Sequence, residues 1–387
     1  MRTNGARGRP TRAPILVCGL EHVPTKIGRH YRAVAAATGA AVVVYARDSS
    51  GLSAEVAERE GVAWCPVPSL ERNTRSRRLR LRRTGGDIRT YLRLLRTLRP
   101  SHVELYHDAA NDAVHLTYVL IAWVSRVPLV AVCRGGELLY WDQHRSNRKA
   151  VFWLGLKLAR LVLYKELHMQ SRLRALRIPD HRTFFWYNRV EVRADEPRPN
   201  LDRRGVLFLN SWRPLRCPDM ALNVALTLAP RYPSIPFTIA GARTWTSEPF
   251  SIEEFEERVR EAGLGGRVKI LPWHSDVRGL FETHSVFLLP AHEVFLNYAL
   301  LEAMERGLVP VIAAAPGAER VVDSGRTGFI VPLDLPEFVS AVDAILKDPE
   351  LETEMCSAAR RRVLEDFDLK CGSKELADLY QDLVWRS

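Results

Sequence analysis

The sequence has no long hydrophobic run. Over its 387 residues, no stretch reaches the roughly 18 uninterrupted apolar residues that a membrane-spanning helix needs. The best candidate, residues 113–132, is interrupted by His115, Arg126 and Pro128, and we interpret it as a helix followed by a buried strand. The composition, 47% hydrophobic and 26% charged, is that of a globular protein, so an integral membrane protein is not expected.

The sequence also lacks paired cysteines and the features of a signal peptide. Its six cysteines are scattered, with no Cys-X-X-Cys motif, which favours reduced thiols over a disulfide framework or a zinc site. Residues 1–13 are rich in Arg, Gly and Pro and have no apolar segment, so we expect a disordered basic tail. Together these features indicate a cytoplasmic protein without a bound metal.

Acidic residues are outnumbered by basic ones. The formal net charge is +11, and residues 71–100 contain eleven arginines against two acids, Glu71 and Asp87. Such a segment attracts phosphates on nucleic acid, anionic lipid or a nucleotide, unless it is simply a solvated helix face. No nucleic-acid-binding motif is present and aromatic residues do not interleave with the arginines, so no nucleic-acid partner is expected.

Short apolar runs alternate with helical patterns, which predicts α/β domains with doubly wound, mostly parallel sheets. A polar, Pro-rich linker at 194–205 separates two Rossmann-like domains of similar size, 14–193 and 206–366, and a C-terminal helix at 367–387 packs back on the first. We expect the domains to face a cleft, with ligands beyond the carboxyl ends of the strands. The expected strands are 14–19, 40–45, 62–66, 101–106, 128–133, 159–165, 205–210, 237–241, 267–271, 285–290, 310–313 and 328–331.

Candidate binding residues follow two strands of the second domain. Arg213 and Arg216 lie between a strand and a helix, where two guanidinium groups can clamp a diphosphate. A helix expected to begin near Asn297 offers unpaired N–H groups and partial positive charge to a phosphate. Glu293 before this helix and Glu302 within it can accept hydrogen bonds from sugar hydroxyls. The alternative is that these side chains only cap helices or face solvent.

The stretch from Glu293 to Pro332 resembles the donor-site signature of retaining GT-B glycosyltransferases of the group 1, or family 4, type. The motifs occur in the same order over about 40 residues, and weaker similarity extends over nearly the whole chain. It implies the GT-B fold and transfer of a sugar from a nucleotide-diphosphate donor to an acceptor hydroxyl with retention, without an obligatory metal or other cofactor. The matching segments are Leu301-Glu-Ala-Met304, Gly307, Pro310-Val-Ile312, Pro316-Gly-Ala-Glu319 and Arg326-Thr-Gly-Phe-Ile-Val-Pro332.

The resemblance assigns roles to the acidic residues and the loop between them. Glu302 corresponds to the second glutamate of the family signature. Glu293 stands nine positions before it where the family has eight, so the position of the first acid falls on either Glu293 or Val294. Asn297, Tyr298 and Ala299 would present backbone amides to the donor phosphate and sugar.

The resemblance also assigns roles to basic and aromatic residues of the second domain. Arg216 takes the position of a family lysine, and Arg213 lies two residues from the position of a family arginine. Both would grip the donor diphosphate and, with Glu293, serve catalysis. Trp273 or His274 would stack on the nucleotide base, unless Trp273 is only a buried side chain.

In the first domain the resemblance is looser. Gly28, beside Lys26 and Arg29, is the remaining glycine of a loop that approaches the donor phosphates in the family. His107 follows a strand where the family often has a catalytic histidine, or it is a packed residue. Arg134 replaces a second histidine; it can bind the donor but cannot act as a base, because arginine stays protonated.

Acceptor binding is expected on the first domain. The basic segment 72–99 and the amphipathic segment 149–160 suggest a peripheral contact with an anionic membrane and a glycan or lipid-linked acceptor; a core helix with a solvated rim is the alternative. The changed glutamate spacing and the missing histidine leave two other functions open: a non-catalytic GT-B homologue, or a polyanion-binding protein that uses the arginine-rich face.

Overall fold

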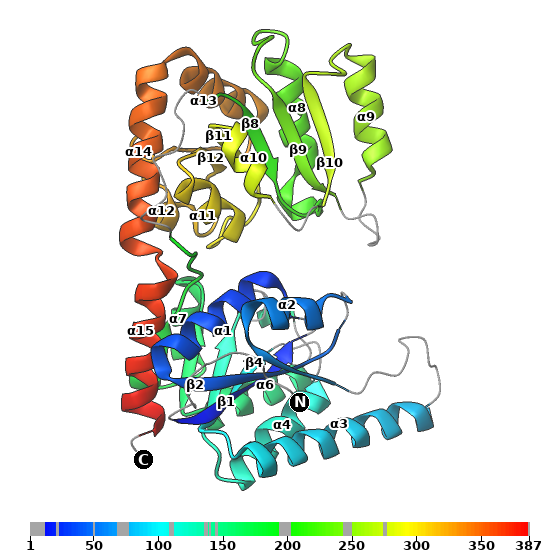
Figure 1. Ribbon diagram of the computed structural model, residues 1–387, viewed down its shortest axis with the longest axis vertical. Coiled ribbons are helices and arrows are strands. Elements are labelled where there is room, and N and C mark those ends of the chain that lie inside the picture. Colours follow the sequence, from blue (N-terminus) through cyan, green and yellow to red (C-terminus); the bar gives the residue numbers. More distant parts are fainter. Residues whose placement is uncertain are drawn as a thin grey trace. The chain divides into compact units, whose positions relative to one another are not determined.

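The computed structural model describes residues 12–20, 23–48, 51–67, 77–107, 112–134, 138, 141–143, 146–192, 203–242, 250–273 and 277–385. The chain divides into two compact units (Figure 1). The first unit comprises Met1–Tyr187 and Leu369–Ser387, and the second comprises Asn188–Asp368. Most of the predicted tail (1–13) and of the predicted linker (194–205) lies outside the described residues.

In the first unit the described residues form a seven-stranded sheet in the order β3-β2-β1-β4-β5-β6-β7, with every neighbouring pair parallel. The chain moves outward from β1 to β3 and then returns to the other side of β1, so the strand order reverses between β1 and β4. The elements are β1 (Arg12–Leu20), α1 (Thr25–Thr38), β2 (Ala40–Ala46), α2 (Ser53–Glu60), β3 (Ala63–Pro66), α3 (Arg77–Leu98), β4 (His102–His107), α4 (Asp112–Val124), β5 (Leu129–Cys133), η2 (Trp141–Gln143), α6 (Ser146–Leu158), β6 (Leu161–Tyr164), α7 (His168–Ala175), η3 (Asp180–Arg182), β7 (Thr183–Phe185), α15 (Leu369–Leu379) and η5 (Tyr380–Trp385).

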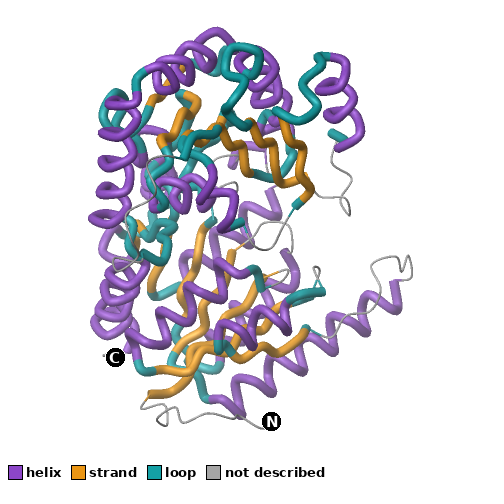
Figure 2. Tube along the Cα trace, turned by 45° about the horizontal axis from the view of Figure 1, so that its top comes forward, coloured by secondary structure: helices purple, strands orange, loops and turns teal. Residues whose placement is uncertain are grey.

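Alternating residues of these strands build a hydrophobic core on each face of the sheet. Leu16 packs in a core with side chains from α3, α4, α6 and α7. The next residue, Val17, packs in the opposite core with side chains from α1, α2, α15 and η5. Figure 2 shows the strands, in orange, flanked by helices. Both faces of the first sheet are therefore covered, as a parallel sheet requires.

The C-terminal segment is held in the first unit by a buried polar network. The Tyr380 hydroxyl donates to Glu104 Oε1 at 2.5 Å, and the Tyr31 hydroxyl donates to Oε2 at 2.8 Å. Burial acts to raise the pKa of Glu104, but hydrogen bonds from His102 and Tyr380 outweigh it and hold this pKa below its ordinary value. The indole N–H of Trp385 meets His102 Nδ1 at 3.2 Å. The last helices thus contribute to the core of the first unit.

In the second unit the described residues form a six-stranded sheet in the order β10-β9-β8-β11-β12-β13. Its neighbouring strands are also parallel, and the order reverses between β8 and β11. The elements are β8 (Val206–Leu209), η4 (Pro214–Arg216), α8 (Pro218–Leu228), β9 (Phe237–Ala242), α9 (Ile252–Glu261), β10 (Val268–Pro272), α10 (Arg278–Thr283), β11 (Val286–Leu289), α11 (Tyr298–Glu305), β12 (Val309–Ala313), α12 (Ala318–Val321), β13 (Phe329–Val331), α13 (Leu335–Lys347) and α14 (Pro349–Asp366).

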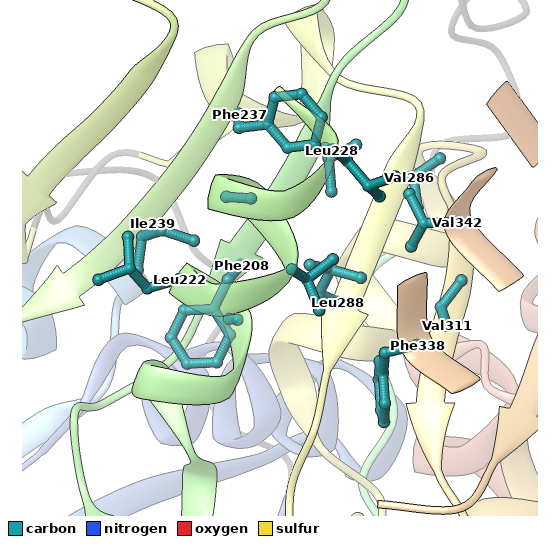
Figure 3. Close-up of a cluster of buried hydrophobic side chains, with 14 of the residues drawn as sticks. Phe208, Leu222, Leu228, Phe237, Ile239, Val286, Leu288, Val311, Phe338 and Val342 are labelled. Carbon is teal, nitrogen blue, oxygen red and sulfur yellow. The ribbon is translucent and has the colours of Figure 1, made fainter. Parts of the chain in front are cut away.

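The main core of the second unit lies between its sheet and the helices α8, α9 and α13. Side chains from β8, β9, β11 and β12 interdigitate there with side chains from α8 and α13 (Figure 3). This packing fixes the strand ends that carry the candidate site. The side chains labelled in Figure 3 are Phe208, Leu222, Leu228, Phe237, Ile239, Val286, Leu288, Val311, Phe338 and Val342.

The predicted doubly wound α/β fold is confirmed in both units. Each expected strand is present, with ends within two residues of the expected positions. The short strand β7 was not predicted. In the described part of the chain, no helix combines the length and the apolar composition needed to cross a bilayer.

Candidate functional site

The predicted residues of the second unit gather at one edge of its sheet. Strands β8 and β11 pair in parallel where the strand order reverses, so the loops that follow them are neighbours. In open α/β sheets this switch point is where ligands bind. Arg213 and Arg216 follow β8, and Glu293 and Asn297 follow β11. These two loops therefore form the candidate site.

Two hydrogen bonds join the loop after β8 to the loop after β11. The backbone N–H of His292 donates to the carbonyl of Leu215 at 3.0 Å, and the Arg216 guanidinium donates to the carbonyl of Glu293. Cys217, in the left-handed conformation with a φ of 46°, ends the turn η4 and leads into α8. Arg216 is thus held between the two loops.

The two arginines have different surroundings. Burial lowers the pKa of Arg216; Glu293 opposes this shift, whereas the positive charge of Arg213 adds to it. An arginine keeps its charge under such conditions. Arg213 itself is exposed. The turn therefore presents one anchored and one exposed guanidinium, a combination suited to a diphosphate.

The loop after β11 is also fixed from its other side, by the loop after β12. The N–H groups of Val294 and Phe295 donate to the carbonyl of Pro316 at 3.2 and 2.9 Å. Phe295 has a φ of 45°. A Cβ atom on Gly317, whose φ is +90°, would lie 2.5 Å from Phe295 Cα, so only glycine allows this approach. The conformation of residues 293–297 is set by these contacts.

Helix α11 begins directly after this loop, as predicted. Asn297 caps it: its side-chain oxygen accepts hydrogen bonds from the N–H groups of Ala299 at 2.9 Å and Leu300 at 3.3 Å. The amide of Ala299, which was predicted to face a ligand, donates to this cap in the structure. Asn297 and Tyr298 lie partly buried at the helix start.

The two glutamates lie on either side of the start of α11. Glu302 is partly exposed in the second turn of the helix. Glu293 is partly exposed in the loop, close enough to Arg216 to affect its pKa. Val294, the other residue at which the spacing could put the first acid, is fully buried. Of the two, Glu293 has the side chain that can reach a ligand.

Two further side chains belong to the same sheet edge. Trp273 directly follows β10 and is partly buried; His274 lies outside the described residues. Asn210, which the sequence analysis missed, directly follows β8. Within the described ranges its amide nitrogen is buried without a hydrogen-bond partner. Its position one residue beyond a buried strand at the switch point could have identified it.

In the first unit the structure corrects the interpretation of Gly28. This residue lies in α1, not in a loop, and its N–H donates to the carbonyl of Pro24 at 3.0 Å. A Cβ atom at this position would lie 2.8 Å from Glu60 Cγ of α2. Close packing of α1 on α2 thus accounts for the glycine.

His107 and Arg134 lie at neighbouring strand ends. His107 ends β4 and pairs with Cys133 of β5; its side chain lies outside the described part of the structure. Arg134 directly follows β5 and is exposed. Its guanidinium carbon lies 4.7 Å from the centre of the Tyr106 ring, within the range of a cation–π interaction.

The segment 149–160 is mainly α6, and its polar side chains are used within the first unit. Phe152 is buried in the core, and the Trp153 indole donates to the carbonyl of Leu176 at 3.2 Å. Lys157 donates to the carbonyl of Arg177, and Arg160 donates to that of Leu383 at 2.7 Å. In this structure the segment is therefore a core helix with a polar rim, which was the alternative to a membrane contact.

The structure also gives the arrangement of the cysteines and of potential metal ligands. All six cysteines are free thiols. Among the described residues, no group of three or more His, Cys, Asp or Glu side chains is arranged to hold a metal ion.

Comparisons with known proteins give this site a family context. Residues 203–348 match the family model described as glycosyl transferases group 1. An alpha-D-kanosaminyltransferase of Streptomyces kanamyceticus is 25% identical over 185 residues, 47% of this chain and 46% of that protein. An Escherichia coli UDP-Gal:alpha-D-GlcNAc-diphosphoundecaprenol alpha-1,3-galactosyltransferase is 26% identical over 125 residues, 32% of each chain. These matches span at most about half the length of the relatives.

Solved structures extend the similarity of fold to nearly the whole chain. HepE of Anabaena, crystallised with UDP and glucose, superposes with a TM-score of 0.73 and 15% identity, covering 96% of this chain and 100% of that one. The predicted GT-B fold is thereby confirmed. The family model falls on the second unit, which contains the candidate site, so this unit is similar to the glycosyl transferases of group 1.

Proposed function

We propose that this protein transfers a sugar from a nucleoside-diphosphate sugar to an acceptor hydroxyl with retention of the anomeric configuration. The main observation behind the proposal is the gathering of Arg213, Arg216 and Glu302 around the switch point of the second unit. Positive charge for a diphosphate and carboxylates for sugar hydroxyls lie at the one sheet edge where ligands of such folds bind.

In this proposal the donor diphosphate lies between the two arginines. Arg216 is anchored to the carbonyl of Glu293, so its position is set before the donor arrives, and the exposed Arg213 closes on the phosphates from solvent. Glu302 and Glu293 accept hydrogen bonds from the sugar or ribose hydroxyls. Trp273 packs near the base.

The proposed reaction depends on the positive charge of the two arginines. As the bond between the anomeric carbon and the diphosphate oxygen breaks, negative charge grows on the diphosphate, and the two guanidinium groups stabilise it. The acceptor oxygen bonds to the anomeric carbon on the same face, and its proton passes to the departing diphosphate. Metal independence is part of this proposal, since the arginines supply the positive charge.

The comparisons support a nucleotide-sugar donor and suggest a class of acceptor. HepE was crystallised with UDP and glucose. The Escherichia coli relative is named for a UDP-sugar and a diphosphoundecaprenol-linked acceptor. We therefore propose a role in glycan, polysaccharide or glycolipid biosynthesis, with a glycan or lipid-linked acceptor.

A donor screen tests the proposal. In a thermal-shift assay with a panel of UDP-, GDP-, ADP- and dTDP-sugars, one donor should raise the melting temperature of the protein. The shift should be lost in Glu302→Ala and kept in Glu354→Ala, an exposed helix glutamate of α14. The NMR coupling constant of the transferred anomeric proton should then match that of the donor. Donor binding without transfer would favour the non-catalytic homologue; no donor binding would favour the polyanion-binding alternative.

We also propose that the first unit contacts an anionic membrane. Leu120, Trp123 and Val124 of α4 are 39%, 60% and 73% exposed, and α4 packs beside α3. Exposed arginines add positive charge: Arg89, Arg93 and Arg96 in α3, and Arg99 directly after it. The protein should co-sediment with phosphatidylglycerol vesicles at low salt. The Trp123→Ser variant should co-sediment less. Equal recovery with phosphatidylcholine vesicles would refute an anionic contact.

A further inference from the structure

Asp87 is the only acidic residue in the sequence of the arginine-rich helix α3, and it is buried, with 5% of its surface exposed. Tyr91 and Leu95, four and eight residues later, are buried on the same face of the helix. Arg89 and Arg93 are exposed. The helix therefore turns its one carboxylate towards the interior of the first unit and these arginines towards solvent.

One oxygen of the Asp87 carboxylate is held by tyrosines from two other elements. The hydroxyls of Tyr45 in β2 and Tyr118 in α4 both donate to Asp87 Oδ1, each at 2.5 Å. No residue that the structure describes donates a hydrogen bond to the other oxygen, Oδ2. A carboxylate oxygen in a buried position is stable only with a donor, so Oδ2 is suited to a water molecule or a ligand.

Asp87 lines a pocket at the carboxyl ends of β1, β2 and β3, and the described residues around this pocket all belong to the first unit. The pocket has a volume of about 20 Å³, which holds a water-sized group but not a sugar ring. Backbone hydrogen bonds fix its rim: the N–H of Arg47 donates to the carbonyl of Leu20 at 3.1 Å, and the N–H of Val67 donates to that of Ala46 at 3.0 Å. Its polar lining consists of Tyr45, Arg47, Asp87, His115 and Tyr118.

Gly19 brings the end of β1 close to His115 of α4. Its φ is +83°, and a Cβ atom there would lie 2.5 Å from the carbonyl oxygen of Tyr106 and 3.3 Å from His115 Nε2, so only glycine allows this approach. His115 is 2% exposed. An imidazole and a carboxylate thus line the same small pocket, one from α4 and one from α3.

A neutral hydroxyl group fits this lining better than a charged group. The carboxylate of Asp87 repels an anion, and the guanidinium of Arg47 repels a cation. A hydroxyl both donates and accepts hydrogen bonds, so it can donate to Asp87 Oδ2 while its oxygen accepts from another group of the lining.

We propose that this pocket binds one hydroxyl or hydroxymethyl group of a glycan acceptor, through Asp87. The inference rests on the proposed function for the identity of the molecule that carries the hydroxyl. It assigns the binding to a pocket of the first unit and names the residue that recognises the group. Asp87 is a binding residue here and not a base, because the hydroxyl that it holds is one that does not react.

Binding of simple glycosides to the full chain tests the pocket. In a saturation-transfer NMR titration with the methyl glycosides of glucose, galactose, mannose and N-acetylglucosamine, at least one should bind. Asp87→Asn should raise its dissociation constant about tenfold or more, because the variant keeps an oxygen for the tyrosines but has an amide N–H₂ in place of Oδ2. Glu58→Gln makes the same change of charge at an exposed position of α2 and should bind as the wild type does.

Deoxy analogues of the glycoside that binds separate recognition from a structural role of Asp87. Removing the recognised hydroxyl should weaken binding to the wild type by the same factor and have no further effect in Asp87→Asn, because the two changes remove one interaction. Equal losses for every analogue in the variant would overturn the proposal, and so would unchanged affinity or no binding of any glycoside to the wild type.

A second variant tests the pocket if Asp87→Asn does not fold. Val67 is partly buried at the rim, and Val67→Phe should fill the pocket and weaken glycoside binding while leaving the carboxylate in place. Unchanged binding in this variant would contradict the site. Wild-type affinity for UDP is measured separately: its absence would contradict the proposed function and leave the result with glycosides standing.

Discussion

The Arg216 guanidinium donates a hydrogen bond to the backbone carbonyl of Glu293, and this one side chain joins the two loops at the switch point of the second unit. The bond fixes the guanidinium before any ligand binds. It also ties the loop that carries Glu293 to the turn that carries Arg213. Charge and loop conformation in the site therefore depend on the same residue.

Replacing Arg216 by lysine should separate the effect of its positive charge on UDP binding from the effect of its hydrogen-bonding geometry. Lysine keeps the positive charge but lacks the fork that can bond to Glu293 and to a phosphate together. We expect the dissociation constant for UDP to rise about tenfold, by calorimetry. Arg213→Lys should change it less, because Arg213 is exposed. Equal effects of the two substitutions would contradict the anchoring role.

Gly317→Ala should disturb the loop after β11. Its Cβ would lie 2.5 Å from Phe295 Cα, so the loop must shift, and UDP affinity should fall together with the melting temperature. Gly325→Ala is the matched control: its φ is also positive, at +84°, but nothing lies within 4 Å of the new Cβ. That change should cost only the left-handed strain, about 1–2 kcal/mol, and leave UDP affinity unchanged.

Tyr380→Phe should destabilise the first unit. The change removes a hydrogen bond to the buried carboxylate of Glu104, at a cost of about 1–3 kcal/mol in the free energy of unfolding. Tyr232→Phe removes a similar bond to Asp343, which lies nearer the surface, and should cost less. Urea denaturation measures both. A smaller effect at Tyr380 than at Tyr232 would argue against the C-terminal network as a stabilising contact.

Stability should fall in mildly acidic solution because of His30. Folding lowers its pKa from about 6.5 to about 4, through burial and then the charge of Lys165, although Glu104 opposes this. Between these values the unfolded chain binds more protons, so this contribution to stability is complete above about pH 6.5 and is lost as the pH falls towards 4. Urea denaturation of His30→Gln should show a weaker pH dependence over this range than the wild type. An identical dependence would refute this assignment.

The strands could be predicted because their hydrophobic runs are buried on both faces of parallel sheets. Val286–Leu289 and Val309–Ala313 are fully buried, so their sequences are almost continuously apolar. β7, by contrast, is an edge strand of three partly buried residues, too short for such a signal.

The residue types of the site could be predicted from the sequence more accurately than their local geometry. Arg216 could be predicted as basic and at a strand end, but its bond to the carbonyl of Glu293 depends on a turn set by Cys217 in the left-handed conformation. Gly28 was misread because a packing glycine in a helix and a loop glycine look alike in one sequence.

Calorimetric titration of UDP, GDP, ADP and dTDP tests most directly whether the second unit binds a donor nucleotide at the switch point. The account predicts that one of them binds, that Arg216→Ala weakens this binding about tenfold or more, and that Arg267→Ala does not. Arg267 is an exposed arginine before β10, at the opposite edge of the same sheet. Binding that is unaffected by Arg216→Ala, or no binding of any nucleotide, would contradict the account.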